Sequence, residues 1–297
     1  MKIDKVFVIC CKADFYLTKI CVASIRFWNK TIPIDLIKDY SQGNFETSEL
    51  EHAFNVSVFN TRLKKMGPYS KLVPFIEEKG KRVFVIDSDI VWMRNAIPEL
   101  ETFSEDLVVH AFYPLEPEKE MSSWYFNLNN LEKYYNGYVY PGFLFNGGQF
   151  VCNTSAFSKE DFNDTIAWQE NVKPIHDNTF LCEDQGILNY AIARRINNSS
   201  ISYQSYPFYS WGYEKTVNKI DVREMNYSKT LPPLIHWLGK KTGLISGLNG
   251  EKILNFYEEY YYSQIADGKQ KLIAARWNRT LQHPLNYAKS IIKGLFT

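Results

Sequence analysis

An apolar run that ends in two acidic residues constrains the fold of this chain more than any other feature. Residues 83–86 are Val, Phe, Val and Ile, and Asp87, Ser88 and Asp89 follow them directly. A short continuous apolar run is typical of a buried strand in a parallel sheet. Residues i and i+2 of an extended segment point to the same side, so both carboxylates can face one object. Because buried charge must be compensated, we expect a divalent cation beside them, at the sheet edge where open α/β sheets bind ligands.

The segments before this run alternate between strand and helix patterns. Strands are expected at residues 5–10, 32–37 and 56–59, a helix at residues 17–28 and another helix from Pro68. Such alternation favours a largely parallel sheet with right-handed crossovers. The sequence therefore predicts an α/β fold with a Rossmann-like, mixed but mainly parallel sheet and flanking helices.

The pattern changes after about residue 100, where Tyr, Trp, Asn and Gly become frequent. Residues 143–152 predict a strand, a tight turn and a second strand, and residues 187–196 predict a helix. Residues 202–213 are aromatic and without clear periodicity, and residues 234–238 predict a short strand before a turn at Gly239. The aromatic segments 124–140 and 203–213 are expected to line a cleft.

Composition excludes some classes of protein and favours others. A formal net charge of +1 gives no general attraction to nucleic acid, so no nucleic-acid partner is expected. The five cysteines form no CxxC pair and are expected to be reduced and buried. The N-terminus lacks the apolar segment of a secretory signal, and no apolar stretch has the length of a membrane span. A cytoplasmic location is the resulting expectation.

The C-terminal segment has a basic and amphipathic pattern. No acidic residue follows Asp267, whereas six basic residues do: Lys269, Lys271, Arg276, Arg279, Lys289 and Lys293. Six apolar residues from Leu285 onward fall on one helical arc. The pattern fits an interfacial helix on an anionic membrane surface, which would make the protein peripheral on the inner membrane face. It fits equally well a C-terminal helix docked on the domain.

Three interpretations of the acidic pair were compared. Asp87 and Asp89 could hold a metal that bridges a nucleotide diphosphate, could act as the acids of a haloacid-dehalogenase-type phosphatase, or could lie in a solvated turn. The phosphatase interpretation is disfavoured, because three expected strands precede the pair and no Gly-Asp dipeptide follows. The apolar flanks disfavour the turn. His236, between an apolar pair and Trp237, is either a buried core histidine or a third ligand, and a mixed carboxylate and imidazole set suits Mn²⁺ better than Mg²⁺.

Further polar residues have both a structural and a functional interpretation. Asn146, Gly147 and Gly148 form either a hairpin turn or a place where a ligand approaches the backbone closely. Asp184 and Gln185 either cap the following helix or bind sugar hydroxyls.

Three lysines leave a similar choice. Lys71, Lys240 and Lys241 are either solvated charges or contacts for a phosphate leaving group.

Together, these segments resemble the GT-A glycosyltransferases, most closely family 8, the type of glycogenin and the bacterial lipooligosaccharide galactosyltransferases. The resemblance covers roughly residues 3–242 and rests on four motifs in order: residues 83–91, residues 145–148, residues 184–189 and residues 236–241.

The resemblance implies three regions and a set of ligands. Residues 1–105 would bind the nucleotide sugar, residues 106–245 would bind the acceptor within the same GT-A domain, and residues 246–297 would form a helical extension. The donor would be a UDP-sugar that supplies a hexose, and the acceptor a glycan or lipid-linked saccharide. The cofactor would be Mn²⁺, with Mg²⁺ as the alternative ion.

The resemblance also implies roles for individual residues. The metal would be held by Asp87, Asp89 and His236, and Asp184 and Gln185 would lie at the reacting sugar. Donor contacts would come from Val8, Cys10, Lys12, Asp14, Tyr16, Lys71, Asp87, Ser88, Asn146, Gly147, Gly148, Gly239, Lys240 and Lys241.

Family 8 enzymes retain anomeric configuration, and Gln185 stands on the sugar face opposite the leaving group, where an amide is a poor nucleophile. Front-face attack, with the leaving phosphate as the base, is therefore expected. The sequence departs from the family pattern at two places: Lys-Lys-Thr replaces the usual Lys-Pro-Trp, and Gly147 replaces the usual Ala. An inverting enzyme that uses Asp184 as the base therefore stays an alternative. A sugar-nucleotide pyrophosphorylase is disfavoured because residues 11–16 contain no glycine, and a non-catalytic glycan-binding module is the remaining alternative.

Overall fold

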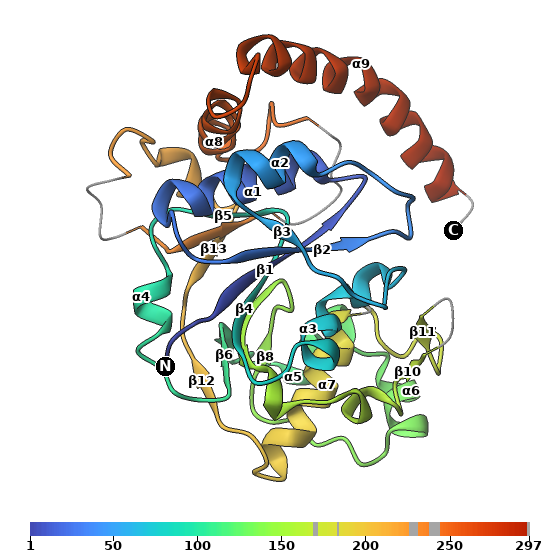
Figure 1. Cartoon of the computed structure of the whole chain (residues 1–297). Coiled ribbons are helices and arrows are strands. Elements are labelled where there is room, and N and C mark those ends of the chain that lie inside the picture. The colour runs from blue at the N-terminus through green and yellow to red at the C-terminus, as the bar shows by residue number, and fades with distance from the viewer. Residues whose placement is uncertain (169–171, 183, 226–230, 238–243, 296–297) are drawn as a thin grey trace.

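The computed structural model describes residues 1–168, 172–182, 184–225, 231–237 and 244–295, with side chains up to residue 281 in the last helix. Within these ranges the main feature is a seven-stranded sheet in the order β12-β6-β9-β4-β1-β2-β3 (Figure 1). Its strands are β1 (Lys5–Cys11), β2 (Ile34–Asp39), β3 (Ser57–Val58), β4 (Arg82–Asp87), β6 (Leu107–Val109), β9 (Gln149–Asn153) and β12 (Tyr203–Ser205).

The sheet is mainly parallel, and the order in which the chain adds strands reverses at β1. β1 pairs in parallel with both β2 and β4, whereas β9 is antiparallel to its neighbours β4 and β6. The chain builds β2 and β3 on one side of β1 and then returns to place β4 on the other side. Ligands bind at such a switch point, outside the carboxyl ends of the strands. The predicted α/β fold with a mainly parallel sheet is therefore confirmed.

Helices cover both faces of the sheet. α1 (Phe15–Trp28), α2 (Ser48–Phe54) and α8 (Glu251–Ser263) lie on one face, and η1 (Gly67–Leu72), α3 (Val73–Glu77) and α7 (Asp184–Asn197) lie on the other (Figure 1). β4 serves both layers, because Phe84 and Ile86 pack toward α1 while Val83 and Val85 pack toward α3. A strand buried on both faces must be apolar at every position, which explains the continuous run.

Short elements connect the layers and extend the fold. A second sheet contains β5 (Ile90–Trp92), β13 (Tyr209–Trp211) and β14 (Leu234–His236), and two strand pairs are β7 (Ala111–Phe112) with β8 (Leu144–Phe145) and β10 (Ile166–Ala167) with β11 (Lys173–Pro174). The remaining helices are α4 (Ile97–Leu100), α5 (Pro117–Trp124), α6 (Leu128–Tyr134), η2 (Thr154–Ala156), η3 (Lys159–Phe162), η4 (Val217–Lys219) and α9 (Gly268–Leu295).

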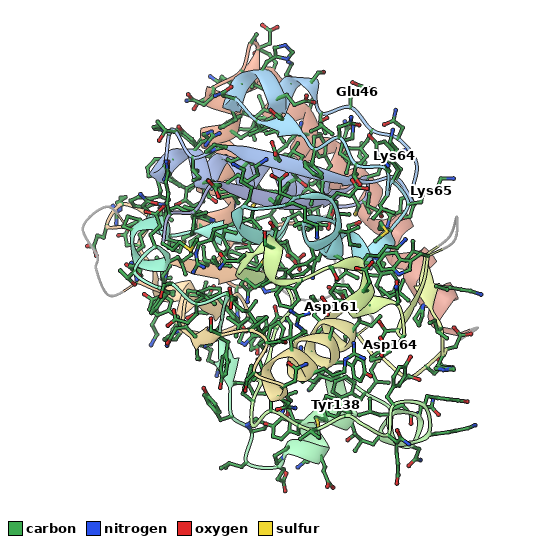
Figure 2. All side chains as sticks on the ribbon, turned by 60° about the horizontal axis from the view of Figure 1, so that its bottom comes forward. Glu46, Lys64, Lys65, Tyr138, Asp161 and Asp164 are labelled. Carbon is green, nitrogen blue, oxygen red and sulfur yellow. The ribbon has the colours of Figure 1, made fainter. Side chains whose placement is uncertain are left out.

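Ion pairs fix two helices that matter for the site and for the C-terminus. In α7, Arg195 donates to Asp161 over 2.9 Å and Arg194 pairs with Asp164, and Figure 2 shows both acids beside this helix. In α9, Arg279 lies 2.5 Å and Arg276 2.9 Å from the buried carboxylate of Glu258 in α8. The first part of α9 is therefore docked, and Figure 1 shows the helix arching along one side of the molecule.

Several sequence expectations need correction. Residues 143–152 form the predicted strand, turn and strand, but the hairpin interpretation of the turn is wrong, because β8 pairs with β7 whereas β9 joins the large sheet. Residues 202–213 are not irregular but contain β12 and β13, whose partners β6 and β14 are distant in sequence. The stretch from Pro68 forms a 3₁₀ turn before α3, and the C-terminal helix begins at Gly268, well before Leu285.

Two further expectations concern the cysteines and the membrane. Cys10, Cys21 and Cys152 are buried as predicted, but Cys11 is half-buried and Cys182 is exposed, so the prediction was wrong for these two. All five lie in the described ranges, and no disulfide joins them. Among the helices described, none has the length and apolar content to cross a bilayer.

Phe84→Ala tests the central position of β4. Phe84 is fully buried and packs against Trp92 and Phe208, so its truncation leaves a cavity. We expect the free energy of unfolding in urea to fall by about 3–5 kcal/mol. The fully exposed Leu115→Ala is the control and should change it by less than about 0.5 kcal/mol. Equal effects of the two substitutions on the free energy of unfolding would contradict the placement of Phe84 in the core.

Candidate active site

The carboxyl end of β4 brings two acids and a histidine together. Asp87 is the last residue of β4, and Asp89 lies in the turn that leads into β5. β5 pairs antiparallel with β14, which sets His236 opposite Ile90, next to Asp89. One ligand atom from each of Asp87, Asp89 and His236 lies within 4.8 Å of the others, and His236 Nε2 is 3.4 Å from Asp89 Oδ1.

Gly148 leaves the space in which the side chains of His236 and Asp87 approach each other. A Cβ atom at position 148 would lie 2.4 Å from His236 Cε1 and 2.9 Å from Asp87 Oδ2. Its φ is outside the left-handed region, so a need for positive φ does not explain the glycine. Position 148 requires glycine because side chains of the site, rather than a turn, occupy the space.

The three side chains fit a divalent cation. Asp89 and His236 are buried, and the Asp87 side chain keeps 22% of its surface exposed. Among the described residues, His236 Nδ1 has no hydrogen-bond partner although it is buried. Two carboxylates and one imidazole form a donor set that can bind a divalent ion, and the carboxylates suit Mn²⁺.

Lys71, in η1, offsets part of the negative charge. Its Nζ lies 2.9 Å from Asp87 Oδ2 and 2.5 Å from Asp184 Oδ2. Burial alone would lower the pKa of Lys71, but the two carboxylates outweigh it and raise the pKa. Burial raises the pKa of Asp87 to about 6, although Lys71 opposes this shift. With Asp89, three carboxylates surround one ammonium in the described part of the site, so the site attracts further positive charge.

The first turn of α7 holds a second group of polar side chains against the 146–148 loop. Gln185 Oε1 accepts hydrogen bonds from Asn146 Nδ2 at 2.7 Å and from the Gly147 amide at 3.3 Å. One turn later, Asn189 bonds the backbone of Phe145 with both its amide nitrogen and its amide oxygen. Asp184 and Gln185 therefore face Lys71 and Asn146 and do more than cap the helix.

Two cavities meet at this cluster. The larger, of about 1060 Å³, and the smaller, of about 270 Å³, are both lined by Lys71, Asp87 and Asp184. His236, Asn146, Gly148 and Gln185 line the larger cavity, whereas Cys10, Asp14 and Ser88 line the smaller one.

The structure does not bring every predicted donor residue to a cavity. Val8 is fully buried in the core, Lys12 is exposed, and Tyr16 lies under Arg279 of α9. None of these three lines either cavity. The predictions for Gly239, Lys240 and Lys241 lie outside the described residues.

Sequence reasoning missed residues in both cavities. Asp39 and Ser41 line the smaller cavity. Their position at the end of β2 and just after it, beside the end of β1, was a usable signal. His110, Glu120 and Glu214 line the larger cavity without any sequence motif. The predicted aromatic segments contribute five lining residues: Trp124, Tyr125, Tyr209, Trp211 and Tyr213.

Comparison with known families decides the class of this site. The family model of nucleotide-diphospho-sugar transferases matches residues 61–242, which include the acidic pair, the 146–148 loop and the start of α7. The chain belongs to this family. It is thus a glycosyltransferase of the nucleotide-sugar type, and the predicted GT-A class is confirmed.

Solved structures agree with this fold. The bifunctional glycosyltransferase WbbM is 14% identical, with a TM-score of 0.59 over 93% of this chain and 52% of WbbM. The galactosyltransferase LgtC, solved with donor and acceptor sugar analogues, is 15% identical, with a TM-score of 0.51 over 87% of this chain and 95% of LgtC. GlyE of Streptococcus pneumoniae TIGR4 in its apo form is 13% identical, with a TM-score of 0.50 over 92% of this chain and 63% of GlyE.

At these identities the likeness shows the GT-A fold shared with family 8-type enzymes. The chain spans about half the length of WbbM and under two thirds of GlyE. No curated protein sequence matches the chain significantly.

Gly148→Ala tests the close approach of His236 and Asp87. The added methyl group would displace one of these side chains, so we expect stabilisation by Mn²⁺ in a thermal unfolding assay to be lost. Gly137→Ala, at a position with open space around the added atom, is the control and should keep the full shift. An unchanged Mn²⁺ response in Gly148→Ala would contradict this account of the site.

Proposed function

We propose that this enzyme is a metal-dependent glycosyltransferase that moves a hexose, galactose or glucose, from a UDP-sugar to a glycan or lipid-linked saccharide. The observation that carries the proposal is the convergence of Asp87, Asp89 and His236 at the junction of two cavities. The likeness to LgtC, described as a galactosyltransferase with donor and acceptor sugar analogues, supports the choice of sugar.

The two cavities support the predicted division of the chain. Apart from Asp184, the smaller cavity is lined by residues before position 89, which favours residues 1–105 as the donor-binding half. The larger cavity is lined mostly by residues from His110 onward, which favours residues 106–245 as the acceptor-binding half. The donor contacts best supported by position are Cys10, Asp14 and Ser88. The other expected donor contacts stay predictions: Val8, Lys12, Tyr16, Gly147, Gly239, Lys240 and Lys241.

The metal proposal names Mn²⁺ as the cofactor and Mg²⁺ as the alternative. When bound, the cation would neutralise charge on the diphosphate of the donor. The protein's own contribution is to hold Asp87, Asp89 and His236 in place before the donor arrives, through β4, the β5 turn and β14. Lys71, already buried between two carboxylates, supplies a second positive charge close to the leaving group.

We propose that transfer retains the anomeric configuration by front-face attack. Gln185 is an amide whose oxygen already accepts two hydrogen bonds, so it orients the donor sugar rather than attacking it. The Asp184 carboxylate is occupied by Lys71 at 2.5 Å, which argues against its use as the base of an inverting reaction. The leaving phosphate is then the base for the acceptor hydroxyl.

Membrane association through the C-terminal helix is part of the same proposal. Ile273, Trp277 and Leu281 are 52–65% exposed and lie four residues apart, on one face of α9. Lys271, Arg276 and Arg279 are paired with Glu49 and Glu258, so these three residues dock the helix. The exposed apolar face, with the exposed Lys269 on the same helix, is left for an anionic membrane surface.

Asp89→Asn tests the metal ligand set. The substitution keeps shape and burial but removes a charge, so we expect transfer from UDP-galactose or UDP-glucose to fall by more than about 100-fold. Removal of divalent ions with EDTA should abolish activity, and Mn²⁺ should restore it. Asp221→Asn, at a partly exposed position that lines neither cavity, is the control. Full activity of Asp89→Asn in metal-free buffer would reject the proposal.

Product stereochemistry tests the reaction course. NMR of freshly formed product should give the same anomeric configuration as the donor sugar, and Gln185→Ala should slow transfer without changing that configuration. An inverted product, together with loss of all activity in Asp184→Asn, would favour the inverting alternative.

A further inference from the structure

The larger cavity continues outward from the candidate metal ligands along three aromatic side chains, Tyr209, Trp211 and Tyr213, here called the aromatic wall. The ring of Trp211 lies 5.2 Å from that of His236, and Tyr213 stacks on Trp211 at 5.9 Å with an angle of 12° between the planes. Tyr209 packs edge-on against Trp211 at 4.8 Å and supports it from the core side. Tyr213 is 62% exposed, so this stack of rings begins at the site and ends in a largely exposed ring.

Such a surface suits a pyranose ring. One face of a hexose exposes C–H groups that pack on an aromatic ring, while the hydroxyls at the ring edge need polar partners. The cavity offers these partners beside the wall, where Glu120, Glu214 and His110 contribute to the lining.

The charges of this outer part have one sign in the described residues. Glu120 and Glu214 are its charged groups, and no described Lys or Arg accompanies them. Lys71, which also lines the cavity, is already paired with Asp87 and Asp184 at the inner end. Burial lowers the pKa of His110 despite the nearby Glu214, so the imidazole adds no positive charge at neutral pH.

Glu120 and Glu214 differ in the hydrogen bonds that their carboxylates make. Glu214 Oε1 accepts a hydrogen bond from the Trp211 amide at 2.8 Å, which ties this carboxylate to the aromatic wall. No hydrogen bond or ion pair joins the half-buried Glu120 carboxylate to another residue in the described ranges. Glu120 is therefore the group that can be changed without disturbing β13.

We propose that the acceptor is an uncharged or amine-bearing pyranose that packs on the exposed ring of Tyr213 at the end of this stack, and that Glu120 and Glu214 exclude acidic sugars such as uronic acids. This inference rests on the proposed function and adds the chemical class of the acceptor. A carboxylate on the acceptor would meet two like charges in a partly desolvated cavity, and repulsion there costs far more than in water.

The test uses three matched probes: methyl glucoside, methyl glucuronide and methyl glucosaminide. Binding of each probe to the 297-residue chain, with Mn²⁺ and UDP present, is measured by quenching of tryptophan fluorescence. We expect the glucuronide to bind at least about tenfold more weakly than the other two. Glu120→Gln should reduce this difference in affinity between the glucuronide and the other two probes, and Glu120→Lys should reduce it further. Glu118→Gln, an exposed residue of the same helix that does not line the cavity, should leave it unchanged.

A second pair of variants tests the aromatic wall. Tyr213→Ala should weaken binding of the neutral glycoside at least about fivefold. Tyr113→Ala removes a ring of nearly equal exposure, 63% against 62%, outside the cavity and should have no effect.

Two results overturn the inference: the glucuronide binds as well as or better than the neutral glycoside, or none of the three probes binds. Hydrolysis of the UDP-sugar without acceptor, measured in parallel, separates this failure from that of the proposed function. If hydrolysis persists, only the acceptor class is wrong; if it is absent, the proposed donor chemistry is wrong as well.

Discussion

Negative charge at the carboxyl end of β4 is the constraint on which the rest of the site depends. Asp87 and Asp89 follow a strand that is buried on both faces, and Asp184 approaches from α7. Lys71 pairs with two of these acids but leaves a formal excess of negative charge among the described residues. Such an arrangement is costly unless a ligand brings positive charge, which the proposed divalent cation would do.

The geometry of the fold places these groups within reach of one another. The parallel pairing of β1 with β4 sets the end of β1 beside Asp87, where the smaller cavity opens. The antiparallel pairing of β5 with β14 carries His236 back from a distant part of the sequence. Gly148 then supplies the only type of residue whose backbone fits between His236 and Asp87. The two cavities meet at this point because both halves of the chain share one sheet.

Local patterns predicted much of this fold, because β4, α1 and α7 each have an apolar periodicity that burial enforces. The sequence did not predict pairings that depend on distant partners, so a hairpin of β8 and β9 stayed open as one interpretation and β12 and β13 were missed. The same limit applies to the site. Asp87, Asp89 and His236 have local signals, whereas His110, Glu120 and Glu214 become neighbours of the site only through folding. Lys71 was expected as either a solvated charge or a phosphate contact, and it is a buried cation paired with Asp87 and Asp184.

The most direct measurement is anomalous diffraction from crystals grown with Mn²⁺ and UDP. The account predicts a single manganese peak bound by carboxylate oxygens of Asp87 and Asp89 and by an imidazole nitrogen of His236, with diphosphate oxygens completing the shell. UDP bound in the smaller cavity without manganese at these three residues, or manganese held by other side chains, would contradict it.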